Sequence, residues 1–322
     1  MRRCYRMKIA IAGSGAMGCR FGSLLHAAGN DVLLLDEWAE HVELINNKGL
    51  QIVNEDGVYT QKIKASFPHE ADGEVELLIV FTKAMQTASM IKSCQQLIGE
   101  KTKVLTLQNG LGNIEELGKY VPENRLLAGV TTFGTELLGP GKIQALGSGS
   151  VQMMQVDGEV TKETEAIVNV MNKAGMNVEI SSNVIVSIWN KVAFNCVLNT
   201  LCTLVKNTVG AVGSYSEINE VISQIVDEII LVAHAEQIQL DKDEIVNMII
   251  NVFDPSMSGN HLPSMLQDME NKRKTEIDFL NGAIVKKAEI HQIPVPVNRL
   301  ISHLITMMEE TRGFNLAEVV NK

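Results

Sequence analysis

A glycine-rich hexapeptide that directly follows a short apolar run constrains the fold of this chain more than any other feature. Residues Gly13-Ser14-Gly15-Ala16-Met17-Gly18 fit the pattern G-x-G-x-x-G, lie after the run Lys8–Ala12 and open an amphipathic segment. The pattern alone is weak, but between a strand and a helix it is typical of a β-α-β unit. There the first glycine permits a tight turn, the second lets the backbone approach a pyrophosphate, and the third lets the helix pack closely on the strand. The sequence therefore predicts a dinucleotide-binding Rossmann unit, with the hexapeptide against the pyrophosphate.

Two acidic residues follow the second expected strand, Asp31–Leu35. Asp36 stands where an acidic residue usually accepts hydrogen bonds from the adenosine ribose, and Glu37 is next to it. No arginine or lysine follows until Lys48. Because two carboxylates would repel a 2′-phosphate, the pair favours NAD(H) over NADP(H) as cofactor. The alternative interpretation is that both are solvated charges at a strand end.

The first half of the chain alternates short apolar runs with amphipathic segments, which is typical of parallel β/α structure. The further expected strands are Glu76–Phe81 and Lys103–Leu107, the expected helices are Met17–Ala28 and Ala84–Ile98, and Lys142–Gln155 is expected to form a hairpin at the sheet edge. The fold class we predict is therefore α/β, with an N-terminal Rossmann-type parallel sheet domain over residues 1–180.

Strand signals fade after about residue 180. Apolar residues recur at three- and four-residue steps from Ile218 to Val232, which predicts one face of a long amphipathic helix. That face is either core or a homodimer interface, and periodicity does not separate the two. The segments Asp241–Val252 and Met265–Ile290 are also predicted to be helices. We therefore expect an all-helical second domain over residues 181–322.

Three polar residues repeat at helical spacing within an apolar segment of this second half. Lys191, Asn195 and Asn199 stand at i, i+4 and i+8 and so share one face of a predicted helix. Buried polar groups need partners, and a ligand is one candidate. A structural role in contacts between helices is the other.

The chain resembles the ketopantoate reductase (2-dehydropantoate 2-reductase) family over essentially its whole length. Several separated motifs in the right order carry the resemblance and are more specific than any one of them. They are Gly13–Gly18, Phe81-Thr82-Lys83, Gln108-Asn109-Gly110, Lys191 with Asn195 and Asn199, and Ser264–Asp268 leading to Thr275–Asp278 and Asn281-Gly282.

This resemblance implies a reductase that converts a 2-keto acid, ketopantoate foremost, into the (R)-2-hydroxy acid pantoate with NADP(H) or NAD(H). Lys191 would stabilise the developing oxyanion and donate the proton. Asn195 and Asn199 would hydrogen-bond the substrate and hold its keto carbon near the nicotinamide. Ser264, near a helix start, would bind the substrate carboxylate. The helical domain would thus bind the substrate and complete an active site in the cleft between the domains.

The resemblance also implies roles for residues near the cofactor. Asn109 would face both cofactor and substrate from the end of a parallel strand, and Lys83 would lie near the cofactor's ribose or phosphates. Glu276 would meet the nicotinamide side of the cofactor and could pair with Lys191 before substrate arrives. The alternative for Glu276 is a surface salt bridge with a neighbouring cation, Lys272 or Arg273.

Two departures from the family pattern bear on cofactor and substrate. Members that use NADPH commonly carry a basic residue after the second strand, where this chain has Asp36-Glu37. Members often have an asparagine in a glycine-containing turn beyond the catalytic helix, and Asn207 does not align clearly with it. Some relatives are NAD-dependent D-2-hydroxyacid dehydrogenases that act on branched or aromatic 2-keto acids. The acidic pair moves this chain toward them. A dinucleotide sensor that has lost catalysis is a third alternative, against which Lys191 and Glu276 argue.

Composition and cysteine usage exclude other classes. The net charge of −10 argues against a nucleic acid or an anionic membrane as main partner. The cysteines are five, scattered and without a C-x-x-C pair, as in a cytoplasmic protein with reduced thiols. No apolar run in the sequence reaches the ~18–20 residues that span a bilayer. The seven histidines form no ligand cluster in the sequence, so no metal is expected.

Overall fold

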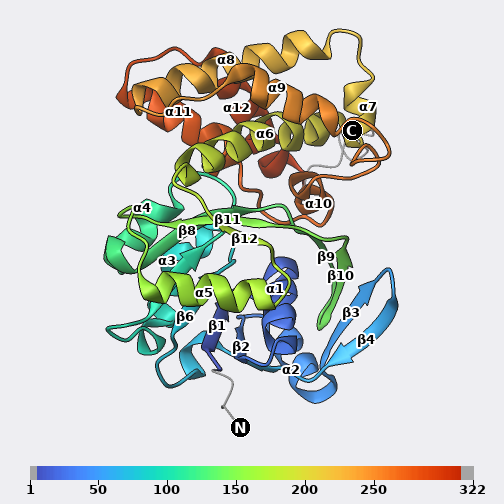
Figure 1. Cartoon of the computed structure of the whole chain (residues 1–322). Coiled ribbons are helices and arrows are strands. Elements are labelled where there is room, and N and C mark those ends of the chain that lie inside the picture. The colour runs from blue at the N-terminus through green and yellow to red at the C-terminus, as the bar shows by residue number, and fades with distance from the viewer. Residues whose placement is uncertain (1–5, 313–322) are drawn as a thin grey trace. The chain divides into compact units, whose positions relative to one another are not determined.

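The computed structural model describes residues 6–312, which divide into two compact units. Within that range the first unit ends at Ser187 and leaves out Asn109–Gly112. Those four residues belong with the second unit, which continues from Ile188. The first unit is built on a mostly parallel sheet and the second on helices (Figure 1), so the predicted fold class is confirmed.

The main sheet of the first unit has the strand order β12-β11-β8-β7-β6-β1-β2-β5 within the described residues. Its strands are β1 (Lys8–Ala12), β2 (Asp31–Leu35), β5 (Lys64–Ser66), β6 (Leu77–Val80), β7 (Lys103–Thr106), β8 (Leu126–Thr131), β11 (Val151–Gln155) and β12 (Val178–Ile180). Neighbouring strands pair in parallel, except for the antiparallel pair of β8 with β11. The centre of the sheet, β2-β1-β6-β7, carries the predicted strands.

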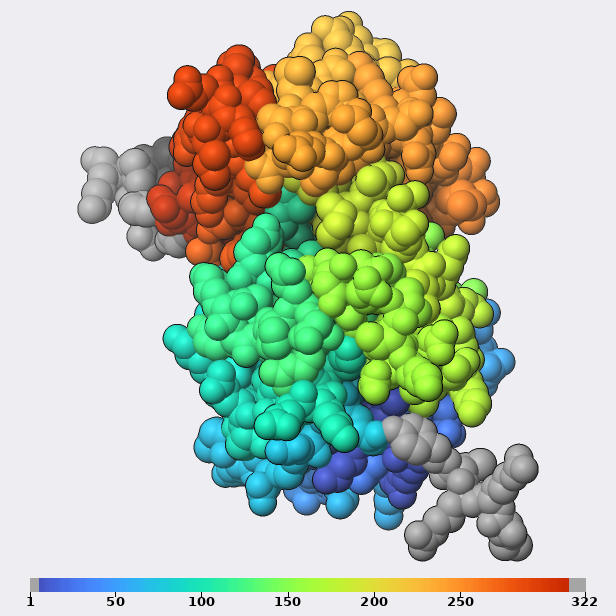
Figure 2. All heavy atoms as spheres, turned by 60° about the vertical axis from the view of Figure 1, so that its left-hand side comes forward, coloured from blue at the N-terminus to red at the C-terminus, as the bar shows by residue number. Residues whose placement is uncertain are grey.

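Helices cover both faces of this sheet, which explains why its central strands are apolar throughout. Alternate residues of β1 face opposite layers: Ile9 and Ile11 join a core cluster with α1, α2 and α5, and Ala10 and Ala12 join another with α3 and α4. The helices are α1 (Ala16–Ala27), α2 (Ala39–Lys48), α3 (Thr87–Ser93), α4 (Asn113–Gly118) and α5 (Lys162–Lys173). Short 3₁₀ turns stand at Pro68–Glu70, Ala84–Gln86, Gln95–Leu97 and Glu123–Arg125. Figure 2 shows α5, in yellow-green, at the surface of this unit.

Two sequence predictions in the first unit are wrong. The segment 84–98 is not one helix, because 3₁₀ turns flank the short α3. The segment 142–155 is not a hairpin, because its two strands join different sheets. A smaller sheet of order β4-β3-β10-β9 holds β3 (Leu50–Asn54), β4 (Gly57–Gln61), β9 (Gly134–Gly139) and β10 (Lys142–Leu146). After β10, Gly147 takes a φ of +49° and the chain turns away to place β11 beside β8.

The second unit is helical in the described residues. Its helices are α6 (Val184–Val205, which begins before the unit boundary), α7 (Val209–Gly213), α8 (Ile218–Ala235), α9 (Lys242–Asn251), α10 (Ser264–Glu270), α11 (Asn281–Ile290) and α12 (Pro296–Thr311). The apolar face of α8 is buried within this chain, so of the two alternatives it is core. In Figure 2 the yellow-to-red residues of α8 to α12 fill one continuous body.

The segment 265–290 is a third wrong prediction, because it is not one helix. After α10, Lys272 takes a φ of +56°, which ends the helix, and a 3₁₀ turn at Ile277–Phe279 precedes α11. The interruption contains Glu276, whose side chain is buried.

Helix α6 alone among the described helices has the length and apolar composition of a membrane span. Most of that window, 61%, is buried inside the protein. A core helix is buried in this way. Length and composition alone do not distinguish a core helix from a membrane span.

Candidate active site

The glycine hexapeptide forms the turn between β1 and α1. Gly13 has a φ of +93°, and a Cβ there would lie 2.5 Å from the Thr82 backbone nitrogen. At Gly18 a Cβ would lie 2.0 Å from the Gly13 carbonyl oxygen. Both positions therefore require glycine for the turn itself, whatever the turn binds.

Gly15 differs from the other two glycines of this turn. It is the N-cap residue of α1, and a Cβ built on it would meet no atom within 4 Å. Packing within the protein does not require glycine here, whereas close approach of a pyrophosphate would. Ala16 and Met17 begin the helix, where backbone N–H groups lack intrahelical partners. Packing within the protein thus does not explain the glycine at position 15, whereas a bound dinucleotide would fit the open space beside it.

Asp36 lies beside this turn at the carboxyl end of β2. Its Oδ2 accepts a hydrogen bond from Ser14 Oγ at 3.3 Å, and its Oδ1 accepts one from the Trp38 backbone N–H at 3.1 Å. Ser14 is fully buried, and its backbone N–H donates to the Leu35 carbonyl. The acidic residue and the glycine turn therefore form one connected structure.

Trp38 follows Asp36 by two residues, and no sequence motif marks it. The residue is 40% exposed, and its indole stacks on the buried His41 ring, with centroids 5.3 Å apart and planes 13° from parallel. The Gly141 N–H donates to His41 Nδ1, and burial lowers the pKa of His41. In the sequence, its place two residues after Asp36 is the signal that puts Trp38 beside the predicted cofactor site.

The ends of β6 and β7 adjoin the glycine turn. Lys83 follows Thr82, which Gly13 approaches closely. The Gln108 side-chain amide donates to the Thr82 carbonyl and to Thr87 Oγ1, each at 2.8 Å. Lys83 is therefore held at the same edge of the sheet as the turn, as predicted for the carboxyl ends of parallel strands.

In the second unit, α6 carries the predicted polar face. Lys191 is partly buried, and Asn195 and Asn199 are each 7% exposed. Four residues of α-helix rise ~6 Å, so these side chains stand one turn apart along the helix. Neighbouring positions such as Val192 and Val197 are fully apolar and buried, and they seat the helix in the core. Helical spacing therefore places the three polar groups on one stripe, and the packing of the apolar neighbours fixes the orientation of the helix.

Lys191 has an altered acidity. Burial lowers the pKa of its ammonium from 10.5 to about 8, and the Glu276 carboxylate acts in the opposite direction. An amine with this pKa exchanges a proton readily near neutral pH. Glu276 is 8% exposed and so does not lie at the surface, and Arg273, one of the two cations proposed as its partner, pairs with Asp268 instead. The pairing with Arg273 at the surface is therefore wrong.

Asn109 belongs to the helical unit although it follows a strand of the first. The Leu111 backbone N–H donates to the Phe279 carbonyl at 2.9 Å. Gly110 has a φ of +89°, and a Cβ there would lie 2.6 Å from the same carbonyl oxygen. The sequence Gln108-Asn109-Gly110 thus crosses from one unit to the other, and the segment after Asn109 packs against Phe279.

Ser264 is exposed and is the first residue of α10, after the buried Pro263. Asn207 lies in the turn between α6 and α7, where its N–H donates to the Cys202 carbonyl at 3.1 Å. The structure thus gathers Lys191, Asn195, Asn199, Glu276 and Asn109 in one unit, and Gly13–Gly18, Asp36 and Lys83 in the other.

Metal and thiol chemistry find no support among the described residues. Within residues 6–312 no three histidine, cysteine or carboxylate side chains gather as metal ligands. The four described cysteines are free and buried, and burial raises their pKa values. Cys4 lies outside the described residues.

Comparison with known families gives two matches, one after the other along the chain. The model described as ketopantoate reductase PanE/ApbA matches residues 9–158, and the C-terminal model of the same family matches residues 183–309. A curated 2-dehydropantoate 2-reductase from Streptococcus pyogenes is 38% identical over 305 residues, covering 94% of this chain and 98% of its own length. One from Lactococcus lactis is 37% identical over 311 residues, with the same coverage.

Solved structures also resemble this chain over nearly its whole length. A D-mandelate dehydrogenase in a ternary complex with NADH and anilino(oxo)acetate matches with a TM-score of 0.92 and 38% identity, covering 96% of this chain and all of that one. A ketopantoate reductase from Ralstonia eutropha JMP134 matches with a TM-score of 0.86 and 30% identity, again over 96% of this chain and all of that one.

Proposed function

Because the chain belongs to the ketopantoate reductase family of nicotinamide-dependent oxidoreductases, we propose that it reduces a 2-keto acid to the (R)-2-hydroxy acid, with ketopantoate as leading substrate and pantoate as product. One observation carries the proposal. A partly buried lysine with a pKa of about 8, next to a buried carboxylate, shares a helix face with two buried amides.

Each of these groups has a task in the reduction. Bound NADH or NADPH supplies the hydride that the keto carbon accepts. The carbonyl oxygen then gains negative charge, which the Lys191 ammonium stabilises and neutralises by donating a proton from Nζ. Glu276 keeps Lys191 protonated in a buried environment that would otherwise favour the neutral amine.

The neighbouring residues bind and orient the substrate. The amides of Asn195 and Asn199 hydrogen-bond its polar groups and align the keto carbon. Ser264 binds the substrate carboxylate, and Asn109 contacts both substrate and cofactor. Gly13–Gly18, Asp36 and Lys83 bind the dinucleotide. The proposal therefore assigns roles to residues of both units.

We also propose that NADH is the preferred cofactor. Asp36 supports this preference, because its carboxylate adjoins the glycine turn through Ser14 and would repel a 2′-phosphate. The same feature supports a second candidate function, an NADH-linked D-2-hydroxyacid dehydrogenase for branched or aromatic 2-keto acids. The likeness to a D-mandelate dehydrogenase bound to NADH favours it specifically.

A two-by-two initial-rate assay tests these proposals. Ketopantoate and benzoylformate are each supplied with NADH and with NADPH. Highest kcat/KM with ketopantoate supports the leading proposal, and highest kcat/KM with benzoylformate and NADH supports the second. No turnover with any pair, despite cofactor binding, would favour a dinucleotide sensor.

The cofactor preference has its own variant. Asp36→Asn removes the charge but keeps an amide oxygen that can accept from the Trp38 N–H. We expect the ratio of kcat/KM for NADH to that for NADPH to fall about tenfold, since ~1.4 kcal/mol corresponds to tenfold in an equilibrium constant. An unchanged ratio would show that Asp36 does not select the cofactor. Glu123→Gln, in a surface 3₁₀ turn, serves as the control.

A further inference from the structure

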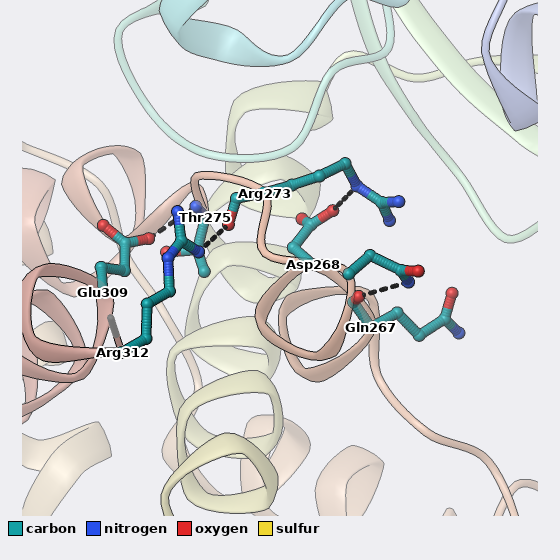
Figure 3. Close-up of polar contacts among 7 residues, drawn as sticks. Gln267, Asp268, Arg273, Thr275, Glu309 and Arg312 are labelled. Atoms are coloured by element: carbon teal, nitrogen blue, oxygen red, sulfur yellow. Dashed lines mark hydrogen bonds and ion pairs between the residues drawn. The ribbon is translucent and has the colours of Figure 1, made fainter. Parts of the chain in front are cut away.

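The backbone segment that carries Glu276 is held from a distant helix. Thr275, next to Glu276, is fully buried, and its backbone N–H donates to Glu309 Oε1 on α12 at 2.6 Å. One turn further along, Arg312 Nη1 donates to the Arg273 carbonyl oxygen at 2.9 Å. Figure 3 shows the side chains of Glu309, on α12, and Arg312, just after its end, turned toward the Arg273–Thr275 segment. Residues 34 and 39 positions later in the chain thus secure the approach to Glu276.

The segment is also secured locally. Arg273 Nε pairs with Asp268 Oδ1 at 2.9 Å, and the Asp268 side chain is 3% exposed. Thr275 Oγ1 accepts from the Ile277 N–H at 3.3 Å and bridges over Glu276. Hydrogen bonds and an ion pair therefore hold the backbone on the N-terminal side of Glu276 in place.

The downstream side of Glu276 is tied to the helix that bears Lys191. Asn281 is fully buried, and its Nδ2 donates to the Cys196 carbonyl of α6 at 3.3 Å and to Asn298 Oδ1 at 3.0 Å. Glu276 thus lies between an anchor on α12 and an anchor on α6. The distance of its carboxylate from Lys191 depends on both.

We propose that Glu309 is a positioning residue for the reaction: by accepting the buried Thr275 N–H, it holds Glu276 in place beside Lys191 during turnover. This inference rests on the proposed function, in which Lys191 donates the proton. Glu309 does not touch the reacting atoms, and its effect passes through the backbone of Thr275 and Glu276.

Loss of this acceptor has a defined consequence for Lys191. A buried N–H without a partner makes the native position of the segment unfavourable, so the segment moves to find one. Glu276 then no longer opposes the effect of burial on Lys191, and the ammonium loses its proton at lower pH. A substitution of Glu309 leaves the other charged groups around the segment unchanged. These are Asp268, Arg273, Lys274, Asp278 and Arg312.

Three substitutions of Glu309 in the full chain separate the acceptor from its charge. Glu309→Gln keeps a carbonyl oxygen at the same reach and loses the charge, whereas Glu309→Asp keeps the charge and withdraws the oxygen by one methylene. Glu309→Ala loses both. Glu310→Ala, at the exposed next position, is the control. For each we would measure kcat, both KM values, and the pH dependence of kcat for keto acid reduction.

We expect Glu309→Ala to lower kcat about ten- to a hundredfold, as displacement of a catalytic group does, and to move the alkaline limb of the profile to lower pH. The KM for the cofactor stays near the parent value. Glu309→Gln and Glu310→Ala retain kcat within about twofold of the parent, since both keep the acceptor, and Glu309→Asp lies between Gln and Ala. The Asp variant keeps the test decisive should the Ala variant not fold.

Different results overturn different statements. Parent-like kcat and pH profile in Glu309→Ala, or Gln as impaired as Ala, would overturn the role of Glu309 as acceptor. Lys191→Ala and Glu276→Gln are measured alongside. If both retain parent activity, the proposed function fails and this inference with it; if both are impaired while Glu309→Ala is not, this inference alone fails.

Discussion

At the scale of single residues, the chemistry depends on opposing influences on one ammonium group. Burial lowers the pKa of Lys191, and Glu276 limits the decrease, so the value is about 8. Without burial the lysine would hold its proton too tightly for ready transfer, and without Glu276 it would be neutral over more of the working range. Neither influence is visible from Lys191 alone.

This balance predicts the pH dependence of the two reaction directions. Reduction needs the ammonium, so kcat/KM for the keto acid should be level below pH 8 and fall about tenfold per pH unit above it. Oxidation of the hydroxy acid needs the neutral amine and should rise over the same range. Initial rates between about pH 6 and 10 measure both.

In Glu276→Gln the alkaline limb of reduction should move to lower pH, because the carboxylate no longer raises the pKa of Lys191. Glu270→Gln, on the exposed surface of α10, should leave the limb in place. A reduction rate that stays level to about pH 10 in the parent would contradict the assignment of Lys191 as proton donor.

At the scale of elements, the β1–α1 turn contains glycines that are needed for different reasons. Gly18 allows the helix to lie against the Gly13 carbonyl, whereas the space beside Gly15 is open in the protein. The first is a requirement of packing. The second becomes a requirement only when a ligand occupies that space.

A matched pair of variants separates these requirements. Gly15→Ala should leave the melting temperature near that of the parent and weaken cofactor binding about tenfold or more, because the added methyl group stands where the pyrophosphate approaches. Gly18→Ala should lower the melting temperature and weaken cofactor binding, because its methyl group would clash with the backbone at Gly13. Thermal unfolding and NADH fluorescence titration measure the two quantities. Unchanged NADH affinity in Gly15→Ala would contradict a pyrophosphate site at this turn.

At the scale of the whole molecule, the ammonium of Lys191 is a cost to stability. Its pKa is lowered from 10.5 to about 8, so at pH 7 the native state holds a proton that the unfolded state binds more tightly. This cost is full below pH 8 and disappears as pH rises toward and past 10.5. An uncharged side chain of similar shape should avoid it.

Lys191→Met should therefore be inactive but more stable than the parent at pH 7, by up to about 3 kcal/mol in the free energy of unfolding. The gain should shrink as pH approaches about 10.5. Urea unfolding at several pH values measures it, and Lys206→Met, in the turn after α6 where the lysine is exposed, is the control. A variant less stable than the parent at pH 7 would show that Lys191 contributes more through its contacts than its charge costs.

Much of the fold follows from local patterns in the sequence. Strands β1 and β2 have the predicted bounds, Lys8–Ala12 and Asp31–Leu35, and α1 and α8 match within a few residues. These elements are recognisable because short apolar runs, glycine turns and helical periodicity act within a few residues of chain. The polar stripe of α6 is readable for the same reason.

Other features were decided only by tertiary structure. The strands β10 and β11 are close in sequence, yet they pair in different sheets: β10 pairs with the preceding β9 and with the distant β3, whereas β11 pairs with β8 and β12. The break that holds Glu276 depends on acceptors such as Glu309, which no local pattern reveals. Asn109 joins the helical unit through a hydrogen bond between Leu111 and Phe279. The sequence by itself thus determined several elements, such as β1, β2 and α8, and the residue types of the proposed site, because both depend on local patterns. Only the tertiary structure decided where helices stop and which side chains meet, because long-range packing and hydrogen bonds outweigh local preference.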